Sequence, residues 1–498
     1  MSGVGKPLNA ATLRELDIPA PAYDRSQVTA GVVHIGVGGF HRAHQAVYLD
    51  RLLDSGATEW GVCGVGTRPA DRRMRDVLLD QDGLYTVALK HPDGRFEPRV
   101  VGSLIDYLYA PDDAEAVIER LASPGTHIVS LTITEGGYQV DPLTGQFAAT
   151  EPDVLLDLEP GATPRSVLGL VVEALKRRRA RGIRPFSVMS CDNVPGNGSV
   201  ARTSFSGFAA MRDPDLGAWV RHSVAFPNSM VDRITPTTSD EDRALLAEQF
   251  GVRDAWPVAC EPYSQWVLED SFSDGRPPLE DVGVQLVDDV VPYELMKLRL
   301  LNAGHQAIAY LGYLAGYRYS DKVCGDPVFA AFLLAYMERE ATPTLPPVPG
   351  VDLDQYRHTL LARFANPYVR DTLARLCSES SDRIPAFVLP VVRDRLAAGG
   401  DVSLAALIVA GWARYAEGTD DSGRPIEVVD RMLEAVTAAA ARSRAQPDAF
   451  LRDTGVFGEL AANERFVAAF SAGLASLRDR GARATVADTV ARLRAGPG

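Results

Sequence analysis

An apolar helical segment that begins near Pro292 carries the side chains best suited to chemistry. The run VPYELMKLRLLNAGHQAIAYLGYLAG places Lys297, Asn302 and His305 among leucines and alanines. At about 100° per residue these three side chains fall near 0°, 140° and 80° around a helix, so all three can face one cavity. A lysine in an apolar setting loses solvation of its ammonium form, which lowers its pKa and lets it take a proton near neutral pH. The pattern predicts a general acid/base at Lys297, and the alternative is that these groups only hydrogen-bond inside a domain interface.

A glycine turn near the N-terminus could hold a nucleotide. The run GVVHIGVGGFHRAHQ leads from an apolar strand into Gly36, Gly38 and Gly39 and then a helical pattern. Dinucleotide folds need glycine there because a Cβ would block the approach of the pyrophosphate, and the next helix offers its first N–H groups. His41 occupies the third glycine position of GxGxxG. The motif therefore fits either a nucleotide site or a tight turn between strand and helix.

The segment GVGTRPADRRMRD follows the next apolar run and bears on the choice of cofactor. Asp71 lies where an acid would bind the ribose hydroxyls of NAD, whereas Arg68, Arg72 and Arg73 could accept the phosphate of NADP. We expect NAD and leave NADP open; a charged helix start at the surface is the alternative.

Two further polar segments follow apolar runs. SCDNVPGNG places Asp192, Asn193 and Asn197 where the carboxyl end of a strand would be, so Asn193 is either an oxyanion donor or the residue that closes a turn. FPNSMVDRITP sets Asp232 beside Arg233, as an ion pair or as an acceptor for substrate hydroxyls. The sequence contains no HExxH, zinc-type Cys/His spacing, GxSxG or P-loop motif, so no metal is expected.

These segments require an α/β N-terminal Rossmann-type domain with a mainly parallel sheet. Strand-like runs at 85–104, 127–134 and 186–193 alternate with helical patterns at 114–121 and 166–179. DVGVQLVDDV is the last strand-like run, and nearly every segment after Pro292 has helical periodicity. We therefore predict a dinucleotide-binding domain over residues 1–285 and an all-α substrate and catalytic domain over 286–498, with the active site between them. Three domains are the alternative that the length allows.

Composition narrows the class of protein. Apolar residues make up 46% and charged residues 23% of 498, which is typical of a globular protein. The formal net charge of −14 disfavours nucleic acid and anionic membranes as partners. Five cysteines without a CxxC pair indicate reduced core thiols, and we find neither a leader pattern nor a membrane-length apolar run. We expect a cytoplasmic protein that acts on small molecules.

The motifs together resemble those of the polyol-specific long-chain dehydrogenase family, the mannitol 2-dehydrogenase family, which also contains fructuronate and tagaturonate reductases. The specific parts are GVGGFHRAHQ at 36–45, SMVDRITP at 229–236 and the spacing of Lys297, Asn302 and His305. The resemblance spans most of the chain and implies a metal-free, monomeric enzyme. It also implies a Rossmann-type domain followed by a helical domain.

The resemblance also implies roles for particular residues. It makes Lys297 the acid/base, Asn193 and Asn302 the donors to the reacting oxygen, and His305 the group that orients substrate. Glu294 would gate proton exchange with solvent. Substrate contacts are expected from Asp232, Arg375 and Arg383, the last being a position where the family commonly has lysine. Cofactor contacts are expected from Gly36, Gly38, Gly39, Phe40, His41, Arg42, Asp71, Thr134 and Glu135.

We thus expect an NAD-dependent oxidoreductase that interconverts mannitol and fructose by hydride transfer at C2. The alternatives are reduction of a keto-uronate, for which Arg375 and Arg383 could bind the carboxylate, and oxidation of arabinitol or sorbitol. A hypothesis of a different class is a non-catalytic sensor of NADH, which would not need the lysine, the asparagines and the histidine together.

Overall fold

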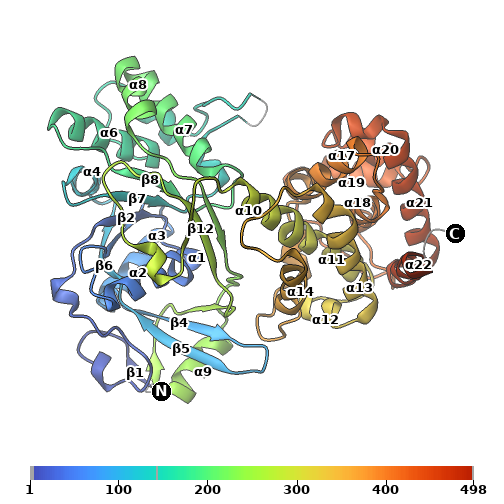
Figure 1. Cartoon of the computed structure of the whole chain (residues 1–498), viewed down its shortest axis with the longest axis horizontal. Coiled ribbons are helices and arrows are strands. Elements are labelled where there is room, and N and C mark those ends of the chain that lie inside the picture. The colour runs from blue at the N-terminus through green and yellow to red at the C-terminus, as the bar shows by residue number, and fades with distance from the viewer. Residues whose placement is uncertain (1–4, 142–143, 496–498) are drawn as a thin grey trace. The chain divides into compact units, whose positions relative to one another are not determined.

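The computed structural model describes residues 5–141 and 144–495. The chain divides into two compact units, Met1–Val291 and Pro292–Gly498 (Figure 1).

The first unit is built on a five-stranded parallel sheet with the order β6-β3-β2-β7-β8. Its strands are β2 (Val32–Ile35), β3 (Val62–Gly66), β6 (Leu104–Tyr109), β7 (Ile128–Leu131) and β8 (Ser187–Ser190). Counted along the chain, this is the order 3-2-1-4-5 of a Rossmann fold. The predicted parallel sheet is confirmed.

Alternate residues of β2 enter two separate cores because side chains of a strand point to opposite faces. Val33 and Ile35 belong to a core with residues of α4 and α6, and Val32 belongs to a core with residues of α2 and α3. Helices on both faces explain why β2, β3, β7 and β8 are buried over their whole length.

The helices of the first unit connect these strands or cover the sheet. They are α1 (Gly39–Ala43), α2 (Gln45–Asp54), α3 (Asp71–Asp80), α4 (Ala114–Ala122), α5 (Pro152–Asp157), α6 (Val167–Ala180), α7 (Asn197–Arg212), α8 (Pro214–Ser223) and α9 (Asp240–Phe250). α4 and α6 match the two predicted helical segments. α7, α8 and α9 were not predicted.

Smaller sheets complete the first unit. β4 (Tyr85–Lys90) pairs antiparallel with β5 (Phe96–Val101), as the hairpin-like sequence predicts, and parallel with β11 (Val258–Cys260). β12 (Gln265–Glu269) lies between β9 (Ser229–Asp232) and β13 (Gln285–Val287), and β1 (Lys6–Pro7) pairs with β10 (Val252–Arg253).

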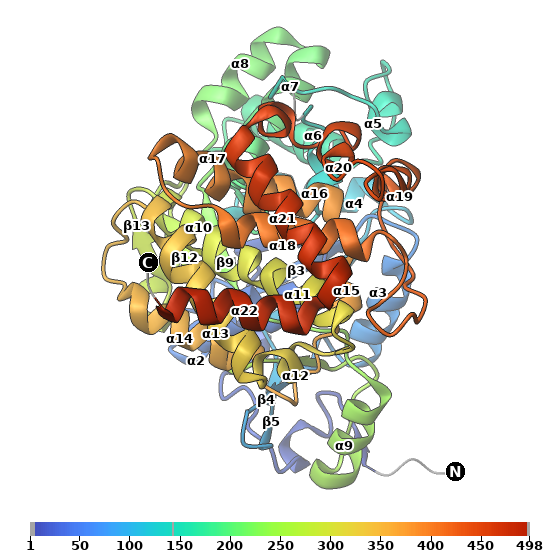
Figure 2. The same ribbon diagram turned by 90° about the vertical axis from the view of Figure 1, so that its right-hand side faces the viewer.

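The named elements of the second unit, in the part that the structure describes, are all helices. Its α-helices are α10 (Val291–Met296), α11 (Ala303–Leu314), α12 (Ser320–Cys324), α13 (Pro327–Tyr336), α14 (Leu353–Phe364), α15 (Leu373–Cys377), α16 (Ser380–Arg383), α17 (Leu389–Ala397), α18 (Ser403–Tyr415), α19 (Leu433–Arg442), α20 (Ala449–Asp453), α21 (Glu464–Arg480) and α22 (Ala482–Ala495). α11 packs against α13, α15, α18 and α22, and α18 packs against α21 (Figure 2). The predicted all-α domain is confirmed.

Short turns of other helical types interrupt both units. The π-helical turns are η5 (Lys297–Asn302), η6 (Met337–Ala341) and η8 (Ile384–Val388). The 3₁₀ turns are η1 (Leu13–Glu15), η2 (Arg25–Gln27), η3 (Glu135–Tyr138), η4 (Leu279–Val282), η7 (Thr342–Thr344) and η9 (Gly458–Ala462).

The helix lengths and the cysteines complete the description of the fold. Across residues 5–141 and 144–495, every helix is too short or too polar to cross a membrane. Cys63, Cys191, Cys260, Cys324 and Cys377 are all buried and carry free thiols.

Candidate functional site

The carboxyl edge of the parallel sheet gathers the predicted residues of the first unit. The chain leaves β2 and β7 for opposite sides of the sheet, which in Rossmann folds opens a crevice at their carboxyl ends. Gly36 follows β2, Thr132–Thr134 follow β7, and Asp192 and Asn193 follow β8. The exposed side chains here include Thr134, Glu135 and Asn193. Residues far apart in the sequence therefore share one edge, as predicted for a ligand-binding crevice.

The glycine turn is tight at its first residue and open at the next two. Gly36 has φ +94°, and a Cβ there would lie 2.2 Å from the Thr132 carbonyl oxygen. The nearest atom to a Cβ on Gly38 is 3.8 Å away, and on Gly39 it is 3.9 Å away. Protein contacts thus require glycine at 36, whereas the bare backbone at 38 and 39 leaves room for a ligand, and these residues fit a dinucleotide.

The helix after the glycine turn differs from the continuous one expected. His44 has φ −121° and ψ −92°, which separates α1 from α2. Its Nε2 lies 2.9 Å from the Gln265 carbonyl oxygen. The break therefore occurs where the histidine ring contacts β12.

His41 and Arg42 support the turn from inside the unit. The His41 ring stacks on His34 with centroids 3.4 Å apart, and neither of its buried nitrogens has a hydrogen-bond partner. Arg42 Nε donates to Gly38 O at 3.3 Å, and its Nη1 donates to Trp256 O. Burial lowers the pKa of both histidines, to about 3 for His34. A contact between His41 or Arg42 and a cofactor stays a prediction.

Asp71 folds back onto the end of β3. Its Oδ2 accepts hydrogen bonds from the amides of Thr67 and Arg68, both at 2.9 Å. The Arg68 side chain donates through Nη2 to Ile133 O at 3.3 Å, and Arg72 is paired with Asp112 at 2.7 Å. The acid therefore shapes the loop in which a ribose would bind, and the arginines beside it already have partners.

The remaining polar residues predicted in the first unit differ in their contacts. Asn197 Nδ2 donates to Asp192 O at 3.0 Å and to Ser229 O at 2.8 Å, which joins β8 to β9 and gives this asparagine a structural role. Asp232 is buried at the end of β9. Arg233 donates to the carbonyls of Glu261 at 3.0 Å and Ala43 at 2.6 Å, so it braces α1.

In the second unit the lysine helix contains a π-turn that its sequence pattern did not predict. η5 begins at Lys297 and ends at Asn302. Because π-helical hydrogen bonds join residues five apart, Lys297 and Asn302 come onto one face, whereas an α-helix would separate them by about 140°. Lys297 is buried, with 8% exposure. The structure corrects the predicted helix and brings the lysine and the amide closer around the axis than the sequence suggested.

The end of the π-turn and the residues after it complete a polar stripe in an apolar helix. Asn302 Oδ1 is buried without a hydrogen-bond partner. The His305 ring stacks on Phe364 of α14 with centroids 4.1 Å apart. Gln306 Nε2 donates to Leu376 O at 3.3 Å, so it has a structural role beside α15. Phe364 was not predicted, and no sequence motif marks it.

The two predicted basic residues lie together. Arg383 Nη1 donates to the Arg375 carbonyl at 2.8 Å, which links α16 to α15. The Arg375 guanidinium binds the Asp371 carboxylate through two bonds, at 2.7 Å and 2.5 Å. Burial lowers the pKa of Arg383, and the charge of Arg375 lowers it further. The spacing of four residues could have indicated Asp371 as a partner of Arg375.

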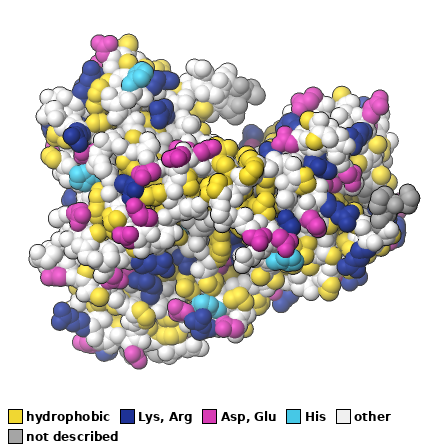
Figure 3. Space-filling model, in the orientation of Figure 1, with side chains coloured by type: hydrophobic (Ala, Val, Ile, Leu, Met, Phe, Trp, Pro, Cys, Tyr) yellow, Lys and Arg dark blue, Asp and Glu magenta, His cyan; other side chains and the backbone are white. Residues whose placement is uncertain are grey.

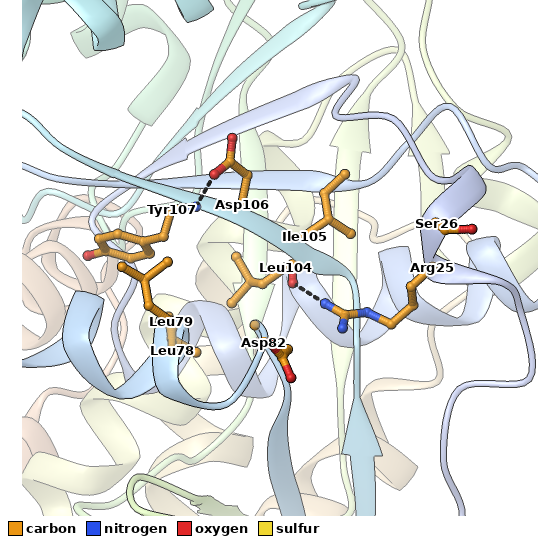
Figure 4. A pocket seen from close by; sticks show the side chains of 10 residues that line it. Arg25, Ser26, Leu78, Leu79, Asp82, Leu104, Ile105, Asp106 and Tyr107 are labelled. Carbon is orange, nitrogen blue, oxygen red and sulfur yellow. Dashed lines mark hydrogen bonds between the residues drawn. The ribbon is translucent and has the colours of Figure 1, made fainter. Parts of the chain in front are cut away.

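A separate hollow of about 390 Å³ in the first unit contains none of the predicted residues. Figure 4 shows Leu78 and Leu79 of α3 facing Leu104 and Tyr107 of β6, with Arg25 donating to Leu104 O at 2.8 Å. It lies against the first half of β6, whereas the candidate site is formed where strands end. We therefore do not assign this hollow to the site.

The described side chains contain no metal-binding cluster, and the face drawn in Figure 3 carries charges of both signs. Within residues 5–141 and 144–495, no three His, Cys, Asp or Glu side chains are grouped to hold a metal ion. On the face drawn in Figure 3, Lys and Arg side chains are interspersed with Asp and Glu.

Comparisons with known proteins match both units. Residues 30–281 match the model of the mannitol dehydrogenase Rossmann domain, and residues 289–478 match that of the mannitol dehydrogenase C-terminal domain. The chain belongs to the mannitol dehydrogenase family.

Relatives in the mannitol dehydrogenase family align over nearly the whole chain. Mannitol 2-dehydrogenase of Phaeosphaeria nodorum is 46% identical over 486 residues, which are 96% of this chain and 85% of that protein. The solved structure of Pseudomonas fluorescens mannitol 2-dehydrogenase in a ternary complex with NAD and D-mannitol is 44% identical, with a TM-score of 0.89, and the match covers 99% of this chain and 100% of that one. A substrate-free D-sorbitol dehydrogenase structure is 36% identical, with a TM-score of 0.87, and covers 96% and 100%. The predicted family and enzyme class, a polyol dehydrogenase, are confirmed.

Proposed function

We propose that this protein is an NAD-dependent, zinc-independent dehydrogenase that interconverts D-mannitol and D-fructose by hydride transfer at C2. The observation that carries the proposal is the 44% identity, over 99% of the chain, to a mannitol 2-dehydrogenase whose structure holds NAD and D-mannitol. The arrangement of polar side chains in both units supports it.

The first unit offers the residues for NAD. The backbone at Gly38 and Gly39 would lie against the pyrophosphate, with Gly36 setting the turn, and Asp71 would bind the ribose hydroxyls. Further contacts are proposed for Phe40, His41, Arg42, Thr134 and Glu135. When bound, NAD accepts a hydride from C2 of the polyol, and NADH returns it to the ketose.

Lys297 is proposed as the acid/base. In polyol oxidation its amine takes the proton of the C2 hydroxyl, and in the reverse direction it returns that proton to the ketose oxygen. Asn193 and Asn302 would donate hydrogen bonds to this oxygen, each contributing about 3 kcal/mol to the transition state. The donor would be the Asn302 Nδ2, and the buried, unpartnered Oδ1 could accept a hydrogen bond from a substrate hydroxyl. Because the acid/base is a lysine, the mechanism needs no metal.

Other residues of the second unit would bind substrate and exchange protons. His305, fixed by its stacking on Phe364, would orient the substrate. Glu294, about one turn before Lys297, would pass protons between the lysine and solvent. Asp232 of the first unit and the Arg375–Arg383 pair would bind the sugar hydroxyls.

The arginine pair also supports a second candidate substrate. Two guanidinium groups linked through α15 and α16 could bind the carboxylate of a keto-uronate such as fructuronate. We give it second place because the relatives named above are mannitol and sorbitol dehydrogenases.

We also propose that the protein works as a monomer in the cytoplasm, without nucleic acid or membrane as a partner. Its formal charge of −14 supports the absence of a nucleic-acid partner. Light scattering coupled to size exclusion tests the monomer.

The decisive experiment follows absorbance at 340 nm with mannitol, sorbitol and arabinitol plus NAD or NADP, and with fructose, fructuronate and tagaturonate plus NADH, in EDTA. Lys297→Ala is the test variant. Lys322→Ala is its control, because Lys322 is exposed and contacts Asp321 at 2.9 Å. We expect EDTA-resistant mannitol and fructose turnover that is lost in Lys297→Ala and kept in Lys322→Ala.

Other outcomes have defined meanings. Turnover of a keto-uronate alone would support the proposed mechanism but make the keto-uronate the substrate. Turnover of sorbitol or arabinitol alone would likewise change only the assigned substrate. NADH binding without turnover of any of these compounds would overturn the proposal in favour of an NADH sensor.

A further inference from the structure

We infer that Asp192 is a positioning residue for this reaction: its carboxylate holds Thr134 in a strained backbone conformation that presents Thr134 and Glu135 at the edge of the crevice. The inference rests on the proposed function, because Thr134 and Glu135 are proposed there as contacts of the cofactor. Asp192 follows β8 and is 8% exposed.

The strain lies at Thr134. Its φ of +63° and ψ of 169° fall in a region populated almost solely by glycine, and threonine carries a branched Cβ. Such a conformation costs about 1–3 kcal/mol and persists where surrounding contacts impose it. Strained residues of this kind cluster at functional sites, so the contacts that impose the strain are informative.

Asp192 supplies those contacts. Its Oδ1 accepts a hydrogen bond from the Thr134 amide at 2.9 Å, and its Oδ2 accepts one from the Ile133 amide at 3.0 Å. Two successive amides therefore point at one carboxylate, which fixes the peptide plane on the N-terminal side of Thr134. Burial raises the pKa of the Asp192 carboxyl, whereas the hydrogen bonds from Tyr138 and the two amides favour its charged form, because charge-assisted hydrogen bonds are stronger than neutral ones.

The same carboxylate also holds the far end of the turn. Tyr138, at the end of η3, donates its hydroxyl to Asp192 Oδ2 at 2.6 Å, and this hydroxyl lies 2.6 Å from Ser190 Oγ. Gly137 N donates to Thr134 O at 3.1 Å, which closes the turn. Both ends of Thr134–Tyr138 are thus anchored to the residue that precedes Asn193, the proposed oxyanion donor.

Asparagine cannot replace the aspartate here. Both carboxylate oxygens accept from N–H or O–H donors, so an amide NH₂ at either position would face a donor. In Asp192→Asn, Thr134 should relax toward an ordinary conformation and turn away from the cofactor. Glycine at 134 tolerates the original backbone without support, so Thr134→Gly should reduce the effect of Asp192→Asn.

The test is a double-mutant cycle of Asp192→Asn and Thr134→Gly, with kcat and KM measured for fructose reduction by NADH. Asp157→Asn is the matched control. Asp157 is also buried and accepts from the amides of Arg165 at 2.9 Å and Ser166 at 2.8 Å and from Ser166 Oγ at 2.6 Å, and it bonds to no predicted site residue.

We expect Asp192→Asn to lower kcat at least tenfold and the same substitution in Thr134→Gly to lower it less than threefold. Asp157→Asn should lower the melting temperature without changing kcat. Equal losses of kcat in both backgrounds, or no loss, would overturn the inference.

Hydrogen–deuterium exchange of residues 132–138 separates this inference from the proposed function, since it requires no turnover. Faster exchange in Asp192→Asn would support the positioning role even if mannitol and fructose were not substrates. Unchanged exchange in Asp192→Asn would count against it, whatever the activity.

Discussion

Single carboxylates shape the loops at the crevice of the first unit. Asp71 accepts from the amides of Thr67 and Arg68, and Asp192 accepts from those of Ile133 and Thr134. Asp71, which is expected to bind the cofactor, also fixes the backbone around it, and Asp192 fixes the backbone at the proposed cofactor residue Thr134. A substitution that keeps the shape of the side chain and removes its charge distinguishes ligand binding from support of the loop.

Asp71→Asn should shift cofactor preference from NAD toward NADP. The amide oxygen can still accept from Thr67 and Arg68, so the loop should keep its shape. Loss of the negative charge removes repulsion of a 2′-phosphate, and we expect the ratio of kcat/KM for NADP to that for NAD to rise at least tenfold. Arg68→Ala in the same background should lower NADP use. An unchanged ratio would show that Asp71 serves only the loop.

Asn302→Ala should lower kcat about 10²- to 10³-fold, because it removes one donor to the reacting oxygen. The matched control is Asn463→Ala, since Asn463 caps α21 by accepting from the Phe466 amide at 3.1 Å. The control should cost about 1 kcal/mol of stability and leave kcat unchanged. Steady-state kinetics with thermal unfolding measure both, and equal effects on kcat would remove Asn302 from the mechanism.

At the scale of elements, the lysine helix departs most from a regular pattern. The π-turn at Lys297–Asn302 joins α10 to α11 within a buried apolar segment. Gly304 follows it, and a Cβ there would lie 3.4 Å from Leu333 and 3.5 Å from Phe364, which are ordinary contacts. This glycine therefore weakens the helix without a steric need.

Gly304→Ala should raise the free energy of unfolding by up to about 1 kcal/mol, the difference in helix propensity between the two residues. We expect kcat/KM to change less than twofold, because the added methyl group fits. Urea unfolding and fructose reduction measure the two quantities. A loss of stability would mean that this backbone requires glycine after the π-turn.

At the scale of the whole molecule, buried titratable groups couple stability to pH. His34 and His41 have pKa values lowered by burial, so the unfolded chain binds more protons below its histidine pKa of about 6.5. The native state therefore loses stability as pH falls through this range, by about 1.4 kcal/mol per pH unit for each histidine.

His41→Phe should remove the contribution of one histidine to the pH dependence of the free energy of unfolding. Phenylalanine keeps a ring against His34 and gives up no hydrogen bond, since both His41 nitrogens lack partners. Urea unfolding between about pH 5 and pH 7 should show a slope smaller by about 1.4 kcal/mol per pH unit. The same slope in wild type and variant would show that His41 is not the group that titrates.

The sequence by itself determined the family, the two kinds of fold and the residue types of the candidate site. Apolar runs that alternate with helical periods require a covered parallel sheet, and glycines at a turn are local signals that neighbouring residues suffice to reveal. Only the tertiary structure decided what the side chains contact. The contact of His44 with Gln265, the stacking of His305 on Phe364 and the bond from Thr134 to Asp192 join residues that no short window contains. The π-turn is local, but the periodicity of its segment predicted an α-helix. The energies of these contacts come from packing and from hydrogen bonds between distant segments, which override the local propensity that a sequence pattern expresses.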